Sequence, residues 1–151
     1  MKNIKLVLIA ILIGVVIGKY IFNQYKEDSI NTISNEEKEI YLMQYGVYKN
    51  ENNMTKNCEN LKNYFYFQDN DGYHVIIGIT KNIDLKNKIV DSYEIKENIY
   101  MKKVKINNQE FLESLNQYDL LISNTNDKNL ILTSEKQILS KYEELILSNE
   151  I

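Results

Sequence analysis

Two residues with hydrogen-bonding chemistry lie inside otherwise apolar segments of this chain. Gln44 lies in the middle of Ile40–Tyr48, and His74, the single histidine, lies near the start of Tyr73–Thr80. Each could be an ordinary solvent-facing residue, or a group that hydrogen-bonds a ligand on an open sheet. No second histidine exists, and no motif places a cysteine or serine beside His74, so a catalytic or metal-binding role lacks partners. We expect a surface histidine rather than a catalytic one.

The acidic segment Gln68–Gly72 separates two apolar runs. Its Asp-Gly pair predicts a hairpin turn. The spaced ligands and closing glutamate of a calcium-binding EF-hand are missing, so we predict no metal ion here. Cys58 is the single cysteine and is expected to be a small core residue. Because no nucleophile–base pair or pair of catalytic carboxylates is recognisable, we predict no enzymatic activity and no cofactor.

Length and charge limit the classes of function. The 151 residues allow one globular domain and an appendage, and the formal net charge is −3. All 18 basic residues are lysine, so the chain has no guanidinium for bidentate phosphate or carboxylate contacts. This composition, together with the extracytoplasmic location predicted below, disfavours a nucleic-acid partner.

The N-terminal segment predicts a membrane anchor. An apolar run from Leu6 to Gly18 extends past Lys19 to Phe22, a length that just spans a bilayer. Cleavage as a signal peptide is the alternative, but no Ala-x-Ala site follows the run. Lysines before the run predict a single-pass protein of the cell membrane, with a cytoplasmic N-terminus and an extracytoplasmic domain. We therefore divide the chain into a cytoplasmic tip and transmembrane anchor at 1–22, a polar linker at 23–38, a domain at 39–106 and a C-terminal helical extension at 107–151.

The pattern of residues 39–106 predicts the order β-α-β-β-α-β. The predicted strands are Ile40–Tyr48, Tyr64–Phe67, Tyr73–Thr80 and Ile99–Ile106, and the predicted helices are Asn52–Tyr64 and Ile83–Glu94. Such a chain folds as an α+β domain of the RNP or ferredoxin-like type. We expect a four-stranded antiparallel sheet with the first and third strands in the middle, both helices on one face and the other face open.

Strict alternation along the two central strands predicts which residues share a face. In the first strand it places Leu42, Gln44 and Gly46 on one face, opposite Met43, Tyr45 and Val47. In the third strand it places His74, Ile76 and Gly78 together, opposite Val75 and Ile77.

Residues 107–151 predict two further helices. A capping-box-like pattern begins the first at residues 107–110, and Ser134-x-x-Gln137 is expected to cap the second. Each helix has an apolar stripe that must be buried. The stripes could pack beside the other helices, cover the open sheet face or bind a partner; we favour packing within the chain.

The two central strands resemble those of the SPOR domain, a family of bacterial envelope proteins. The first strand carries an aliphatic–Gln–x–Gly–x–aromatic pattern in residues 43–48, and the third carries aromatic–polar–Val–x–aliphatic–Gly in residues 73–78. The resemblance covers about 67 residues and includes the element order, the anchor and the linker. Residues 107–151 lie outside the family pattern.

This resemblance implies binding of peptidoglycan, in particular glycan strands without stem peptides, in cell division or sporulation. It implies a ligand across the open sheet face, with a site at Gln44, Gly46, Tyr73, His74, Ile76 and Gly78. The alternative is a protein-interaction module on the same fold, whose C-terminal helices recruit a division or wall-synthesis protein.

Overall fold

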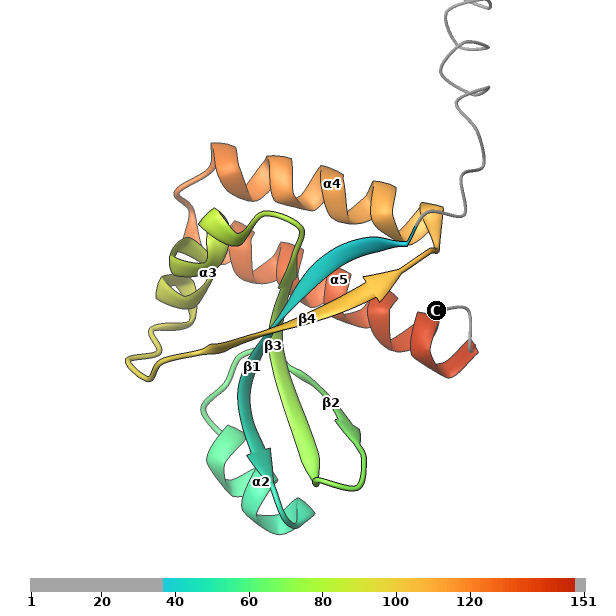
Figure 1. The fold of residues 1–151 in the computed structure, drawn as a ribbon. Helices are drawn as coiled ribbons and strands as arrows, with labels where there is room; N and C mark the ends of the chain where they lie inside the picture. Colours follow the sequence, from blue (N-terminus) through green and yellow to red (C-terminus); the bar gives the residue numbers. More distant parts are fainter. Residues whose placement is uncertain (1–36, 149–151) are drawn as a thin grey trace, which may run out of the picture. The chain divides into compact units, whose positions relative to one another are not determined.

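The structure of the protein is a computed structural model that describes residues 37–148. Four strands and four α-helices, with one short 3₁₀ helix, make up this part of the chain (Figure 1). In chain order they are β1 (Lys38–Tyr48), α2 (Glu51–Cys58), β2 (Phe65–Gln68), β3 (Tyr73–Thr80), η1 (Ile83–Leu85), α3 (Lys86–Tyr93), β4 (Tyr100–Ile106), α4 (Gln109–Asn124) and α5 (Lys128–Ser148). The predicted order β-α-β-β-α-β, followed by two helices, is confirmed.

The strands form one antiparallel sheet with the order β2-β3-β1-β4. The two apolar strands β1 and β3 are therefore the central pair, as predicted. β2 is short. It begins at Phe65, opposite Ile76, so the residues of β3 after Ile76 have a strand neighbour on one side only. That exposed edge of β3 needs other hydrogen-bond partners.

Two β-bulges change the predicted faces of the central strands. Gln44 pairs with Ile76, whereas Gly46 pairs with Val75, so Tyr45 is an extra residue in β1. Ile77 is likewise extra in β3, because the neighbouring pairs are Gln44 with Ile76 and Met43 with Gly78. A bulge shifts the alternation by one residue. The predicted faces of Gly46, Val47 and Gly78 are therefore wrong.

Helices α2 and α3 pack on one face of the sheet. Met54 and Cys58 of α2 contact Val75, while Ile89 of α3 shares a cluster with Met43 and Ile77. Asn50 caps α2 by accepting a hydrogen bond from Asn53 N–H at 2.9 Å. Both predicted helices on one face are thus confirmed, and Cys58 is a buried core residue.

The first helix ends earlier than predicted. Its last residue is Cys58 rather than Tyr64, and Leu61 N–H then closes a turn on Cys58 O at 2.9 Å. Asn63 Nδ2 donates to Leu132 O of α5 at 3.0 Å, which holds this segment against a distant helix. The helical periodicity of 59–64 is overridden by this tertiary contact.

Helices α4 and α5 cover much of the opposite sheet face, which the sequence predicted to be open. Figure 1 shows them at one end of the sheet, with α2 at the other. Leu42 and Ile76 of the sheet share one core cluster with Phe111 and Leu115 of α4 and with Ile138 of α5. The expectation of an open face is wrong over this half, while packing of the helical stripes within the chain is confirmed.

Helix α5 begins six residues before the predicted cap at Ser134. Asp127 caps it instead: Asp127 Oδ1 accepts from Asn129 N–H at 2.8 Å and from Leu130 N–H at 3.3 Å. Ser134 lies inside the helix, where its hydroxyl donates to Leu130 O at 2.9 Å. A serine inside a helix can donate a hydrogen bond to the carbonyl group four residues earlier, so a serine does not by itself mark a helix start.

Carboxylates from the two C-terminal helices replace the missing strand beside β3. Glu135 Oε2 of α5 accepts from Ile79 N–H at 3.0 Å. Asp119 of α4 accepts from the Thr80 hydroxyl at 2.7 Å and from Lys81 N–H at 2.8 Å. These contacts satisfy backbone donors that β2 is too short to reach.

None of the helices between residues 37 and 148 is long and apolar enough to cross a membrane. The predicted anchor, residues 6–22, and most of the predicted linker lie outside the described residues.

Candidate functional site

One end of the sheet face remains accessible beside α4 and α5. We call it the open end, and its residues are Gln44, Val47, Phe67, His74, Tyr100 and Lys102. The direct cross-strand pairs Phe67–His74, His74–Val47 and Gln44–Tyr100 place them on one face. Tyr100 is 64% exposed and Val47 41%, so the surface presents aromatic and aliphatic groups to solvent.

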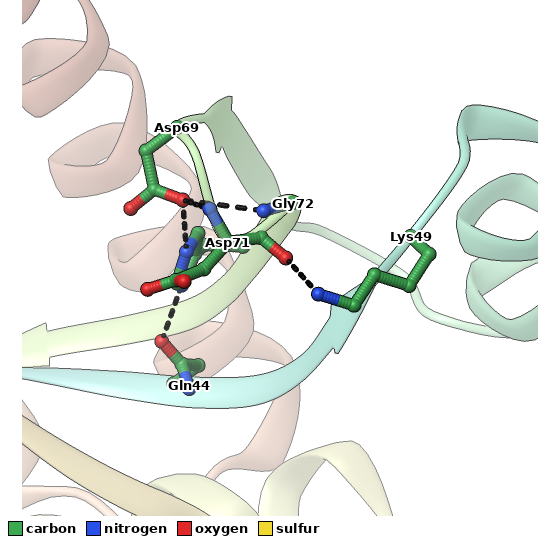
Figure 2. A network of polar contacts seen from close by, with 6 residues as sticks. Gln44, Lys49, Asp69, Asp71 and Gly72 are labelled. Atoms are coloured by element: carbon green, nitrogen blue, oxygen red, sulfur yellow. Dashed lines mark hydrogen bonds and ion pairs between the residues drawn. The ribbon is translucent and has the colours of Figure 1, made fainter.

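A chain of hydrogen bonds joins β1, β3 and the β2–β3 turn at this end (Figure 2). Gln44 Oε1 lies 3.0 Å from His74 Nδ1, and Asp69 Oδ1 lies 2.8 Å from His74 Nε2. His74 is 7% exposed although it lies near the end of its strand. Both of its ring nitrogens therefore face oxygen atoms. Which of the two nitrogens donates depends on the tautomer of the imidazole.

The turn that supplies Asp69 is closed by its own backbone. Asp69 Oδ1 also accepts from Asp71 N–H at 2.8 Å and from Gly72 N–H at 3.3 Å. Gly72 has φ +136°, a conformation that side chains rarely adopt, which explains the glycine at this position. Lys49 Nζ donates to Asp71 O at 2.9 Å and links the turn to the end of β1 (Figure 2).

These contacts also lower the pKa of the Asp69 carboxylate. Partial desolvation would raise its pKa, but hydrogen bonds from Asp71 N–H, His74 and Gly72 N–H, with the attraction of His74, lower the pKa overall. Asp69 is therefore ionised over the ordinary physiological range. The turn presents a negative charge to the buried edge of the imidazole.

Phe67 and Lys102 complete the surface around His74. The rings of Phe67 and His74 are stacked, with centroids 4.9 Å apart and planes within 3°. Lys102 Nζ lies 5.2 Å from the Phe67 ring centroid, within range of a cation–π contact. The stacking fixes the orientation of the His74 ring, and Lys102 places one positive charge over the Phe67 ring.

The structure brings together only two of the six predicted site residues. Gln44 and His74 lie at the open end, in contact with each other. Ile76 is on the same face but is fully buried under the C-terminal helices. The other three lie on the opposite face.

Those three residues have structural neighbours there. A Cβ on Gly46 would meet the Tyr48 ring, and one on Gly78 would meet Ile89 and Met43 at 3.1 Å. Tyr73 packs with the cluster around Met54 and Cys58. Tyr48 also packs against that cluster.

Five residues at or next to the open end were not predicted as site residues from the sequence: Val47, Phe67, Asp69, Tyr100 and Lys102. Phe67 and Asp69 have a sequence signal, because a tight Asp-Gly hairpin pairs the last residues before the turn with the first residues after it. Tyr100 and Lys102 have none, because their place next to Gln44 and Leu42 depends on the register of β4 on β1.

The chain was compared with protein-family models, with curated proteins and with solved structures, and no match was found in any of the three comparisons.

Proposed function

We propose that residues 37–148 form a non-catalytic, SPOR-like binding domain that binds peptidoglycan glycan strands at the open end of its sheet. In this proposal the N-terminal segment anchors the domain at the outer side of the cell membrane. The observation that carries the proposal is the accessible face beside Gln44, where an exposed aromatic ring, an amide and a lysine lie on adjacent strands.

The chemistry of this surface suits a polysaccharide. Sugar rings pack their apolar faces on aromatic rings, and their hydroxyl groups exchange hydrogen bonds with amides. Tyr100 offers the exposed ring and Gln44 the amide, whose carbonyl also contacts His74. Lys102 could pair with carboxylate groups along a strand without stem peptides. The sheet order β2-β3-β1-β4, with two helices on one face, supports the SPOR-like part of the proposal.

The C-terminal helices restrict where a ligand could bind. Ile76 and Leu42 lie beneath them, at 0% and 1% exposure, so a glycan strand would have no access to that half of the face. We therefore limit the proposed contact to the open end, which is shorter than a complete sheet face.

Sedimentation with purified cell-wall sacculi tests this function. A soluble fragment, residues 37–151, is expected to sediment with amidase-treated sacculi more than with intact sacculi. Tyr100→Ala and Gln44→Ala should each weaken binding by roughly tenfold, the equivalent of about 1.4 kcal/mol. Tyr66→Ala is the matched control, because Tyr66 is 41% exposed but pairs with Val75 on the opposite face.

Equal retention by both kinds of sacculi, or equal retention of the Tyr100→Ala and Tyr66→Ala proteins, would count against glycan binding at the open end. The alternative, recruitment of a division or wall-synthesis protein, would have to use the outward sides of α4 and α5. Leu120 is 65% and Leu147 is 76% exposed there. Septal localisation that survives Tyr100→Ala but is lost in Leu120→Ser would favour that alternative.

A further inference from the structure

Three side chains with metal-binding atoms converge at the β2–β3 turn. One ligand atom each from Asp69, Asp71 and His74 lies within 4.8 Å of the others. We propose that these three residues bind a divalent transition-metal ion, with Zn²⁺ as the probe that identifies the site. The expectation from sequence was that His74 lacks partners and that no metal binds here.

The first argument is the orientation of His74. The ring is stacked on Phe67, and Gln44 Oε1 lies 3.0 Å from Nδ1. A proton on Nδ1 would be donated to this oxygen and would leave the Nε2 lone pair free for a metal ion. Metal-binding histidines are held in this way, with one nitrogen on a carbonyl and the other directed at the ion. Gln44 is thus the residue that would hold the metal-binding tautomer.

The second argument is what Nε2 faces. In that tautomer the Nε2 lone pair would face Asp69 Oδ1, 2.8 Å away, where a bound cation would take the place of the ring proton that otherwise joins the two atoms. His74 is 7% exposed, so bulk water does not screen the contact fully. The buried imidazole therefore adds a nitrogen ligand to the two acidic residues at this turn.

The third argument is distance. Zn²⁺ binds imidazole nitrogen at about 2.0–2.1 Å and carboxylate oxygen at about 2.0–2.2 Å, so tetrahedral ligands are roughly 3.3 Å apart. The His74–Asp69 separation of 2.8 Å needs to open only slightly. Both aspartates are exposed and can turn toward the ion. Asp71 holds the turn through its backbone N–H and C=O groups, which leaves its carboxylate available.

The donor set selects the kind of metal. One imidazole and two carboxylates suit Zn²⁺ and similar transition metals, whereas Ca²⁺ and Mg²⁺ prefer oxygen ligands alone. Three protein ligands leave one tetrahedral position for water or for an oxygen atom of a bound molecule. This inference does not rest on glycan binding, since all three ligands come from the turn and the adjoining residues of β3.

Calorimetric titration of the untagged full-length protein in detergent with ZnCl₂ tests the site. One Zn²⁺ per chain is expected, with no comparable binding of Ca²⁺ or Mg²⁺. Asp71→Asn and His74→Gln should each weaken binding by at least about tenfold. Asp84→Asn is the matched control, because Asp84 is an exposed aspartate on η1, remote from the turn in the chain.

Two Gln44 variants test the orienting role separately. Gln44→Leu should weaken Zn²⁺ binding by about 10- to 100-fold, and Gln44→Glu should strengthen it, since a carboxylate holds the metal-binding tautomer more firmly. Nitrogen chemical shifts of His74 should move at Nε2 when Zn²⁺ is added. These readouts do not depend on sacculi, so failure of glycan binding leaves them intact.

No Zn²⁺ binding below about 1 mM, a free-energy change weaker than about −4 kcal/mol, would overturn the proposal. So would binding that Asp71→Asn and His74→Gln leave unchanged, because the ion would then lie elsewhere on the protein. His74 nitrogen shifts that respond to protons but not to Zn²⁺ would show a protonated imidazole as the only cation, which also overturns it.

Discussion

At the scale of single residues, Glu135 is the most unusual side chain in the described structure. It is fully buried, and only one of its oxygens has a hydrogen-bond partner among the described residues. Burial, with repulsion from Asp119, raises its pKa well above the ordinary value, although the bond from Ile79 N–H acts against this. The pKa of Tyr93 on α3 is raised mainly by burial, and the negative charge of ionised Glu135 raises it further. Glu135 is therefore protonated in the folded protein at pH values where it is ionised in the unfolded chain.

This difference predicts a pH-dependent stability. Because the folded pKa is raised, Glu135 contributes its full stability below about 4.5, its ordinary value, and loses it as pH rises towards the folded pKa. Glu135→Gln keeps an acceptor for Ile79 N–H and removes the ionisation. The free energy of unfolding of Glu135→Gln, relative to that of the wild-type protein, should rise by up to about 1.4 kcal/mol per pH unit between the ordinary pKa and the folded pKa of Glu135.

Urea unfolding of both proteins from pH 4 to pH 8 measures this difference. Asp119 also has a pKa raised by burial, but it is present in both proteins, so its contribution largely cancels. Glu144→Gln on the exposed side of α5 is the control. A constant difference between wild-type and Glu135→Gln across the pH range would refute the buried ionisation.

At the scale of elements, the contact between β3 and the C-terminal helices depends on carboxylates as well as on apolar packing. β2 begins at Phe65, opposite Ile76, so the last residues of β3 have no neighbouring strand on that side. Asp119 and Glu135 accept hydrogen bonds from this edge. The helices thus take the place of a longer β2 along this edge of β3.

Removing the Asp119 carboxylate should weaken this junction. Asp119→Ala leaves Lys81 N–H without its acceptor and the Thr80 hydroxyl with only Asn82 O. Thr80 is 0% exposed, so we expect a loss of about 1–3 kcal/mol in the free energy of unfolding. Denaturant unfolding checks the value, with Glu113→Ala on the exposed side of α4 as control. A loss equal to that of the control would mean that water replaces the carboxylate without cost.

At the scale of the whole molecule, residues 37–148 share their core between the sheet and the C-terminal helices. Ile40 and Ile106 of the sheet lie in the same cluster as Leu112 of α4 and Leu139 and Tyr142 of α5. The predicted division into a domain at 39–106 and an extension at 107–151 therefore separates two parts of one core.

A truncated chain tests this dependence. Residues 37–106 alone would expose Leu42, Ile76 and Ile79, each at most 1% exposed in the longer protein. Burial of one such side chain contributes about 1.5–3 kcal/mol, so several together exceed a typical margin of stability. We expect residues 37–106 to be unfolded or aggregated, and residues 37–148 to be folded, by circular dichroism and amide NMR dispersion. A cooperatively folded 37–106 fragment would show that the helices are a dispensable addition.

The sequence by itself determined the elements and the identity of the central strands. Alternation and helical periodicity are local properties, so β1, β3, β4 and the two helices of 39–106 could be located within a few residues. Gln44 and His74 could be selected for the same reason, because a polar side chain inside an apolar run is visible without a structure.

Only the tertiary structure decided what those residues contact. The bulges at Tyr45 and Ile77 moved Gly46 and Gly78 to the other face. A glycine inside a strand is a weak sign of a bulge, but only the pairing of the strands fixes which residue is extra. The placement of α4 and α5 on the sheet depended on a core shared between distant segments, and the contact between Asp69 and His74 depended on the hairpin register. The site is therefore formed by pairing between strands. This pairing is a non-local interaction, and the spacing of residues along the sequence does not reveal it.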